Sequence, residues 1–195
     1  MSFASGYRGT VGGAVQTSYT DQPGIAVPGM LAFASDLNFC DAYVVGEANG
    51  IAAGRGVKVA AITDSISGQI PNQSIKLPES GDTNAVFAGI MIYDDSMQSD
   101  ENGVPGWAEG RMARVAKPGR AGARVFVKAV EAVDHTSASV NLVVAGGSDG
   151  IYKAGEFAPA ALAGSAAAGY SVSLSAVARW ISSSAAGGVA CIELI

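Results

Sequence analysis

Charged residues are scarce in this chain. Only 12 Lys and Arg and 17 Asp and Glu occur among 195 residues, so that 15% of the chain is charged, whereas a typical soluble domain carries about 25%. A compact monomer of this length would expose roughly 8,500 Å² of surface, and so few charges leave much of it weakly hydrated. We therefore expect part of the surface to be covered by other protein.

Histidine and cysteine are rare as well. His135 is the only histidine, and Cys40 and Cys191 are the only cysteines. Three such residues so far apart in sequence do not match the spacing of zinc ligands. Because the chain does not open with a basic stretch followed by an apolar one, as a secretory signal does, we expect synthesis in a cytoplasm, where thiols stay reduced. Both cysteines are expected as free buried thiols, and a disulfide between them is the alternative left open.

Long apolar runs and an excess of positive charge are also missing. No uninterrupted apolar stretch approaches the roughly 18 residues of a membrane-spanning helix, so no membrane association is expected. The net charge is -5, which is the wrong sign for general binding to nucleic acid. Phosphate-loop and dinucleotide-binding spacings are missing, and the acidic stretch 94–101 lacks the Gly and Glu of a calcium-binding loop. The sequence therefore predicts no cofactor and no metal site.

Glycine and proline, by contrast, are abundant and evenly spread, with 26 Gly and 7 Pro. Helix-breaking residues at this spacing exclude long helices. The segments between them are rich in Val, Ile, Thr and Tyr, which is typical of short strands joined by turns. The sequence predicts an all-β protein with strands at 30–35, 42–47, 57–63, 85–93, 107–116, 123–133, 139–145, 171–182 and 189–194. The stretch 157–168, rich in Ala and Gly, is expected to form one short helix or irregular structure.

The domain organisation is predicted from the position in the sequence after which large apolar side chains become frequent. Residues 1–29 contain many Gly, few large apolar side chains and no sustained period, so they are predicted to form an extended N-terminal arm that a neighbour orders. Residues 30–195 are predicted to form a single β-rich domain. Within it we expect an inserted barrel-like unit at about 84–155, carried on strands from both chain ends.

Half of the cations of the chain fall within one short segment. They are Arg111, Arg114, Lys117, Arg120, Arg124 and Lys128. Residues 118–119, Pro-Gly, predict a turn, so the segment is expected to form a hairpin. From residue 124 onward, alternation places Val125 and Val127 on one face and the cations on the other. Two interpretations stay open: a solvated face balanced by nearby acids, or a docking surface for an acidic partner.

One catalytic pattern is present, and its context argues against it. Residues 146–150 read Gly-Gly-Ser-Asp-Gly, which matches the G-x-S-x-G pattern of hydrolases. That pattern requires a helix after the serine and a histidine later in the chain, whereas His135 precedes Ser148. We therefore predict a tight turn and no enzymatic activity, with a hydrolase that uses Ser148 as a competing hypothesis.

Several short motifs follow one another in order along the chain. They are Pro28-Gly29-Met30-Leu31-Ala32, residues 52–57, Gly89-Ile90, residues 110–115, the strand 123–129, residues 178–183, Gly187-Gly188-Val189-Ala190 and Ile192-Glu193-Leu194. In this succession the chain resembles the structural cement, or head decoration, proteins of tailed bacteriophages. The resemblance implies a non-enzymatic β-rich protein on the capsid exterior that bridges neighbouring major capsid proteins. The acidic loop 94–101 is not part of the pattern, and its role stays open.

The resemblance and the scarcity of charge lead to one predicted function. We expect a capsid decoration protein, made in the host bacterial cytoplasm, that binds the major capsid protein, self-associates as a dimer or trimer and stabilises the shell against DNA pressure. Its expected contact residues are Phe3, Tyr7, Tyr19, Trp107, Arg111, Arg114, Arg120 and Arg124. A carbohydrate- or receptor-binding module, and another virion subunit of the tail or baseplate, are the alternatives.

Overall fold

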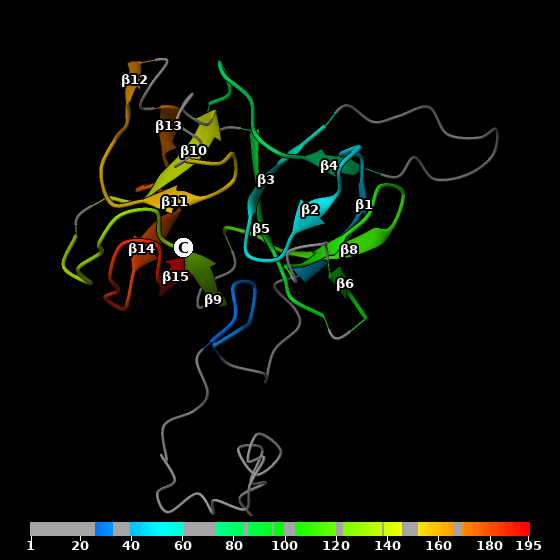
Figure 1. Ribbon diagram of the computed structural model, residues 1–195, viewed down its shortest axis with the longest axis horizontal. Helices are drawn as coiled ribbons and strands as arrows, with labels where there is room; N and C mark the ends of the chain where they lie inside the picture. The colour runs from blue at the N-terminus through cyan, green and yellow to red at the C-terminus, as the bar shows by residue number, and fades with distance from the viewer. Residues whose placement is uncertain are drawn as a thin grey trace, which may run out of the picture.

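The computed structural model describes residues 26–32, 40–60, 73–83, 86–94, 96–99, 104–119, 123–137, 139–145, 152–165 and 169–195. The regular elements among them are β-strands, which confirms the predicted all-β class. Within these ranges no helix is long and apolar enough to span a membrane. Figure 1 shows two lobes side by side, one built from the strands before residue 117 and the other from the strands after residue 122.

The first lobe is a closed barrel. Its strands, in spatial order, are β1 (Cys40–Val45), β4 (Ser74–Lys76), β3 (Gly56–Val59), β5 (Phe87–Met91) and β8 (Met112–Ala116). A second, three-stranded sheet adjoins it, in the order β2 (Ile51–Ala52), β7 (Pro105–Trp107) and β6 (Gln98–Ser99). In Figure 1, β2 lies within the ring of barrel strands, and Ile51 and Trp107 pack with the barrel core. The small sheet therefore closes one end of the barrel.

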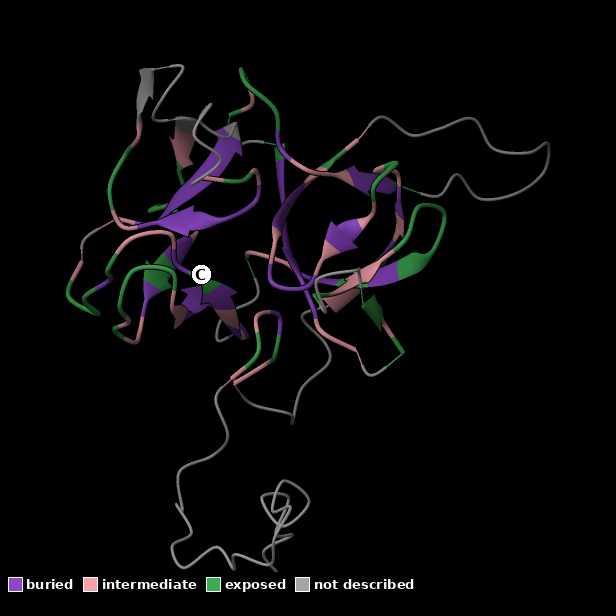
Figure 2. Ribbon diagram, in the orientation of Figure 1, coloured by how far each residue is buried: buried purple, intermediate pink, exposed green. Residues whose placement is uncertain are grey.

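The second lobe consists of two open sheets that share one core. The three-stranded sheet runs β14 (Ala178–Trp180), β15 (Val189–Leu194), β9 (Ala123–Lys128). The four-stranded sheet runs β11 (Phe157–Ala158), β10 (Asn141–Ala145), β13 (Gly169–Ser173), β12 (Ala163–Ser165). Val125 and Ile192 from the first sheet and Leu142 and Phe157 from the second belong to one buried cluster. Figure 2 shows buried residues filling the interior of both lobes.

Strand β5 is the wall between the two cores, and all of its residues are buried. Ala88 and Met91 belong to the barrel core, whereas Phe87 and Ile90 belong to the core of the second lobe. Regular alternation cannot place residues 87 and 90 on the same face. A β-bulge, seen as a register shift in the pairing of β3 with β5, resolves the conflict. The two lobes are therefore joined through one strand that serves both.

Glycine is required at the bulge. Gly89 has a φ of 143°, a backbone conformation that residues with a side chain rarely adopt. A Cβ at this position would collide with the backbone carbonyl oxygen of Ala116 on β8. The close approach of β5 and β8, and with it the closure of the barrel, depends on the missing side chain.

The closed barrel lies elsewhere than predicted. Its strands fall between residues 40 and 116, and only β5 and β8 overlap the expected unit at about 84–155. β1 pairs with β8 and with β4, partners that are distant in sequence, and apolar patterns do not reveal such pairings. The residues described in 157–168 form β11 and β12 rather than a helix, because Phe157 pairs with Leu142 and fills the core. The division into an arm and a single domain stays a prediction.

Both cysteines are free thiols, so the alternative of a disulfide is wrong. Cys191 on β15 is buried, as expected, and burial raises the pKa of its thiol to about 11. Cys40 on β1 is only half-buried.

Candidate functional site

The structure describes half of the predicted contact residues, namely Trp107, Arg111, Arg114 and Arg124. Phe3, Tyr7, Tyr19 and Arg120 lie outside the described residues, and so does Ser148.

The described cations do not lie on one hairpin, so that prediction is wrong. β8 pairs with β1 and β5, whereas β9 pairs with β15. A turn does form at Pro118 and Gly119, but it marks the passage of the chain from the barrel to the second lobe. A Pro-Gly pair specifies a change of direction and not the partner of the strand that follows. The cations are therefore divided between the two lobes.

On the barrel, the cations belong to a surface that we call the β8 surface, made of Ala42, Val44, Arg111, Met112 and Arg114. Alternation along β8 turns Ala113 and Val115 inward and leaves Met112 and Arg114 exposed. Ala42 and Val44 of β1 lie beside them in register. Within the described residues neither arginine forms an ion pair. The β8 surface thus combines an exposed methionine with two available guanidinium groups, a mixture that is typical of protein interfaces.

Asp94 lies near this surface. The hydroxyl and the N–H of Ser96 donate hydrogen bonds to its carboxylate at 2.6 and 2.9 Å. These bonds, followed by the charge of Arg114, lower the pKa of Asp94. Asp94 therefore remains ionised and partly offsets the positive charge of the β8 surface.

On the second lobe, Arg124 belongs to a ladder of three charged side chains on adjacent strands. Glu193 of β15 is opposite Arg124 of β9 and Arg179 of β14. Arg124 Nε lies 3.1 Å from Glu193 Oε1, and Arg179 Nε lies 2.6 Å from Glu193 Oε2. Burial alone would raise the pKa of Glu193, but the hydrogen bonds from Arg179 and Arg124 outweigh it and lower that pKa. Two arginines thus share one carboxylate, and the Arg179 side chain remains 64% exposed.

The described end of the predicted arm runs beside this ladder. Gly29 N–H donates to Phe126 O at 2.6 Å, and Ala32 N–H donates to Arg124 O at 2.9 Å. Phe126 N–H in turn donates to Met30 O at 2.9 Å. Residues 29–32 therefore cover the edge of β9 that β15 leaves free.

Two of the motifs that carry the family resemblance meet at the junction of the lobes. Gly54 follows β2, and a Cβ on it would lie 2.6 Å from Pro28 Cβ. A Cβ on Gly29 would lie 2.8 Å from Gly54 N and from Tyr93 N. Both glycines also have positive φ, 89° for Gly29 and 75° for Gly54. These segments approach so closely only because neither residue has a side chain.

A buried carboxylate lies at the same junction. The Glu156 side chain has no exposed surface, and Arg55 Nη2 of the barrel lobe lies 3.2 Å from its Oε1. Lys128 Nζ of β9 lies 3.3 Å from the same oxygen, and Lys153 N–H donates to Oε2 at 3.0 Å. Arg55 Nη1 also donates to Ala154 O at 3.1 Å. Glu156 therefore connects the two lobes through charge-assisted hydrogen bonds.

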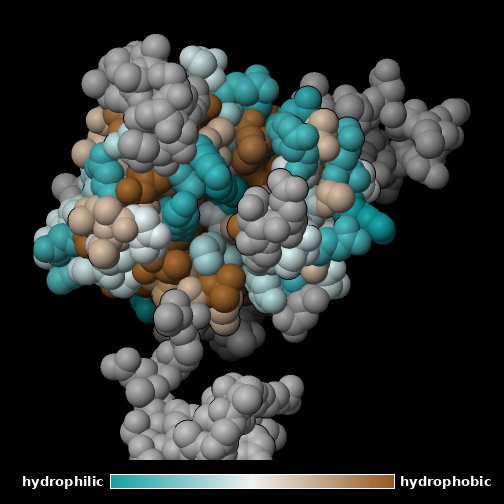
Figure 3. Space-filling model, in the orientation of Figure 1, coloured by the Kyte–Doolittle hydropathy of each residue, from teal (hydrophilic) through white to brown (hydrophobic). Residues whose placement is uncertain are grey.

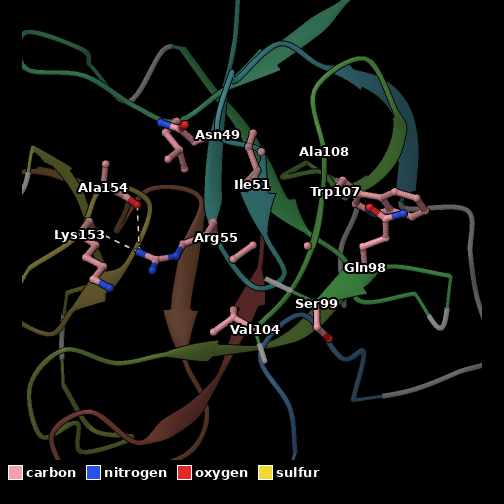
Figure 4. A pocket seen from close by; sticks show the side chains of 14 residues that line it. Asn49, Ile51, Arg55, Gln98, Ser99, Val104, Trp107, Ala108, Lys153 and Ala154 are labelled. Carbon is pink, nitrogen blue, oxygen red and sulfur yellow. Dashed lines mark hydrogen bonds between the residues drawn. The ribbon is translucent and has the colours of Figure 1, made fainter. Parts of the chain in front are cut away.

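Trp107 lies at the closed end of the barrel, and its role as a contact residue stays a prediction. It is half-buried, packs against the barrel core and lines a cavity of about 670 Å³. Figure 4 shows this cavity, with Gln98 beside Trp107 on one side and Arg55, Lys153 and Ala154 on the other. The indole Nε1 is buried and has no hydrogen-bond partner among the described residues.

The apolar surface is broken into separate patches. In Figure 3, brown patches alternate with hydrophilic side chains on the face shown. Among the described residues, the exposed large apolar ones are Val27, Met30, Val59, Val86, Val104, Met112 and Ile195. Met30 and Val27 lie near the ladder, and Met112 lies on the β8 surface. Three of these seven side chains thus accompany the exposed cations, two on the second lobe and one on the barrel.

The single histidine is not arranged as a catalytic base. His135 Nδ1 lies 3.2 Å from Ser183 Oγ and 3.2 Å from Asp134 Oδ1. A catalytic triad needs the two ring nitrogens to bind different partners, the nucleophile on one and the carboxylate on the other. Here one nitrogen faces both, in an exposed turn. Within the described ranges, no three His, Cys, Asp or Glu side chains are grouped so that they could hold a metal ion.

Glu156, Lys153 and Arg179 belong to these sites but were not predicted from the sequence as site residues. The sequence did offer one indication for Glu156, because it is the only charged residue in the stretch 155–178. An isolated charge in such surroundings is either exposed or paired. No pattern in the sequence indicates that its partners are Arg55 and Lys128.

The comparisons with known proteins agree with the sequence resemblance. A family model described as structural cement protein (E217 gp24/Pam3 gp6) matches residues 15–195. The fold is similar to that of a chain in a solved structure of the capsid of Myoviridae phage XM1, with a TM-score of 0.51. The sequence identity is 19%, and the match covers 92% of this chain and 94% of that chain. No curated protein matches this chain.

Proposed function

Because the chain belongs to the structural cement protein family, we propose that it is a non-enzymatic decoration protein that binds the outside of a bacteriophage head and bridges neighbouring major capsid proteins. The observation that carries the proposal is the extent of the family match, residues 15–195, which includes both lobes. The proposed mechanism is adhesive: packaged DNA pushes capsid subunits apart, and a protein bound across their boundary must detach before they separate.

The distribution of cations supports a bridging role. The β8 surface belongs to the barrel, and the Arg124–Glu193–Arg179 ladder belongs to the second lobe. One copy therefore carries two separate surfaces with exposed arginines, each accompanied by exposed apolar side chains. Interfaces of ordinary size cover about 800 Å² on each partner. Two of them on one copy would account for much of the surface that the scarce charges leave weakly hydrated.

The junction supports the same role, because a bridge that transmits force needs lobes that do not swing apart. β5 contributes to both cores, and Glu156 is bound by cations from both lobes. A closely packed core and a buried charge network both resist relative motion.

The proposal is tested by adding purified protein to heads that lack it. We expect hundreds of copies per head, saturable binding, and greater resistance of the decorated heads to heating. Charge reversal on the β8 surface, Arg111→Glu with Arg114→Glu, is expected to weaken binding about tenfold, which corresponds to about 1.4 kcal/mol. Arg179→Glu on the ladder is expected to weaken it to a similar degree. A handful of copies per head would instead favour a tail or baseplate subunit.

The matched control is Lys76→Glu on β4. This residue is a half-buried barrel cation outside both surfaces, and its reversal changes the net charge by the same amount as Arg179→Glu. If Lys76→Glu weakens head binding as much as Arg179→Glu, net charge rather than the ladder governs the contact. We also propose a dimer or trimer in solution, which sedimentation of the purified protein measures.

A further inference from the structure

Two cavities join where the lobes meet, and together we call them the junction groove. The larger, of about 670 Å³, lies between the small sheet and residues 153–154. The smaller, of about 270 Å³, extends to Val27 and Pro28. They share Ala52, Arg55, Val104 and Lys153. The groove thus runs from the closed end of the barrel, shown in Figure 4, to the point where the described chain begins.

One wall of the groove is the free edge of a β-sheet. In the order β2-β7-β6, β2 is an outer strand. Ile51 is opposite Trp107, and Ala53 N–H donates to Pro105 O at 2.9 Å. In an antiparallel pair the bonded positions alternate, so the N–H and C=O of Ala52 point away from β7. Ala52 lines both cavities, and a free donor and acceptor on such an edge can pair with another extended chain.

The charges that line the groove are unbalanced. Among the described residues that line it, the charged ones are Arg55, Lys128, Lys153 and a single carboxylate, that of Glu156. Both oxygens of Glu156 are already occupied, Oε1 by Arg55 and Lys128 and Oε2 by the backbone N–H of Lys153. The ammonium group of Lys153 forms no ion pair within the part of the chain that the structure describes. The described lining of the groove therefore has an excess of positive charge, in a protein whose net charge is -5.

We infer that the junction groove binds an extended acidic segment of a neighbouring virion protein, which pairs with the β2 edge at Ala52 and places a carboxylate beside Lys153. The inference rests on the proposed function and deepens it by naming the chemistry of one partner segment. Charge complementarity selects the acidic side chains, and the free edge selects an extended backbone. A sugar fits less well, because Trp107, which packs against the barrel core, is the one aromatic side chain among the described residues that line the groove.

The test uses fluorescent peptides of about ten residues, long enough to span the groove at about 3.3 Å per residue. The probe alternates Glu and Thr, and the control peptide alternates Lys and Thr. We expect saturable binding of the acidic peptide that weakens as salt is raised, and no binding of the basic one. Lys153→Glu is expected to raise the Kd at least about tenfold, whereas Lys76→Glu leaves it unchanged. Circular dichroism of each variant checks that it is folded.

A third peptide separates strand pairing from simple attraction of charge. It has the same Glu and Thr sequence with alternate backbone amides N-methylated, so that one edge cannot pair. We expect this peptide to lose most of its affinity. The inference would be overturned if the methylated peptide bound as tightly as the unmethylated one. It would also be overturned if an oligomer of uronic acid bound as tightly, because the groove would then be a general anion site.

The outcome for the groove and the outcome for the proposed function are read separately. If the protein decorates heads and no acidic peptide binds, the groove inference fails and the decoration role stands. If the acidic peptide binds in a manner that depends on Lys153 but heads are not decorated, the groove stands and the decoration role fails.

Discussion

The two lobes solve the problem of unpaired strand edges in different ways. The barrel closes on itself, so each of its strands has a neighbour on both sides, and its core is apolar. The second lobe has open sheets, and β9 is covered on its outer side by residues 29–32. The buried carboxylates of the described chain, Glu156 and Glu193, belong to this second lobe. Closure makes the barrel self-sufficient, whereas the open lobe uses chain segments and charges to join other elements.

The largest expected effect comes from the strand that the lobes share. Gly89→Ala would place a methyl group against the Ala116 carbonyl, and it would also force an unfavourable φ. We expect the free energy of unfolding to fall by about 4 kcal/mol or more, or the protein to fail to fold, because the bulged strand β5 contributes side chains to both cores. Urea unfolding followed by fluorescence measures it.

The control is Gly110→Ala in the barrel lobe. Gly110 also has positive φ, 76°, but nothing lies within 4 Å of a Cβ built there. It is expected to cost only about 1 kcal/mol, the strain of a left-handed residue. Equal losses in the two variants would show that the close approach of β5 and β8 contributes nothing.

The second expectation concerns the charge at the junction. Glu156→Gln removes the carboxylate while Arg55 and Lys128 remain, and a buried cation without a partner is costly. We expect a loss of about 3 kcal/mol in the free energy of unfolding, since Lys128 can still turn toward water. Glu79→Gln is the control, because Glu79 is 70% exposed in its ion pair with Lys58 and should cost less than about 1 kcal/mol. A loss for Glu156→Gln as small as the control would mean that the lobes are held together by packing alone.

A third, smaller effect tests whether the lobes unfold together. Ile75→Val trims the barrel core and Ile192→Val trims the core of the second lobe, and both side chains are fully buried. Each variant is expected to cost about 1 kcal/mol. Because β5 belongs to both cores, we expect one cooperative transition in calorimetry for each variant and for the double variant. Two separate transitions would contradict the prediction that residues 30–195 form a single domain.

The smallest effect is a dependence on pH. The pKa of Glu193 in the second lobe and that of Asp82 in the barrel are both lowered, against the effect of burial, by hydrogen bonds from their partners. A carboxyl whose pKa is lower in the folded state stabilises the fold above its unfolded pKa, and this contribution is lost as pH falls through the folded pKa. Stability should therefore decline below about pH 4.5.

Removing the carboxyl group of Glu193 or of Asp82 measures how much each lobe contributes to the dependence of stability on pH. Glu193→Gln and Asp82→Asn should each flatten part of the acid slope, by on the order of 1 kcal/mol, the contribution of one ordinary charged hydrogen-bonded pair. Urea unfolding at pH 3, 4, 5 and 7 measures the slope. An unchanged slope in both variants would place the acid sensitivity in other carboxyl groups.

The sequence alone predicts the class of the fold and most of its strands. β1, β5, β10 and β15 lie within or overlap the expected strands, because alternation and breakers are local signals. The burial of Val125 and Val127 and the outward position of Arg124 were also predictable from alternation. The barrel at residues 40–116 and the separation of β8 from β9 were not. Both depend on which strands pair, and pairing between distant segments leaves no local trace.

The candidate site divides in the same way. The sequence gathers Arg111, Arg114 and Arg124 in one segment and leaves open whether they form a solvated face or a docking surface. It does not indicate that Arg124 shares Glu193 with Arg179, or that Arg55 and Lys128 meet at Glu156. Those contacts join residues from separate strands and loops.

Composition and local pattern by themselves determined that this chain is all-β and poor in charge, since these properties depend on residue types and short spacings. Only the tertiary structure decided that one bulged strand serves two cores, that the described cations are divided between two lobes and that Arg55, Lys128 and Lys153 line a groove at their junction. The physical reason is that strand pairing and charge burial are long-range choices. They are made by the free energy of the whole packed chain and not by any one segment.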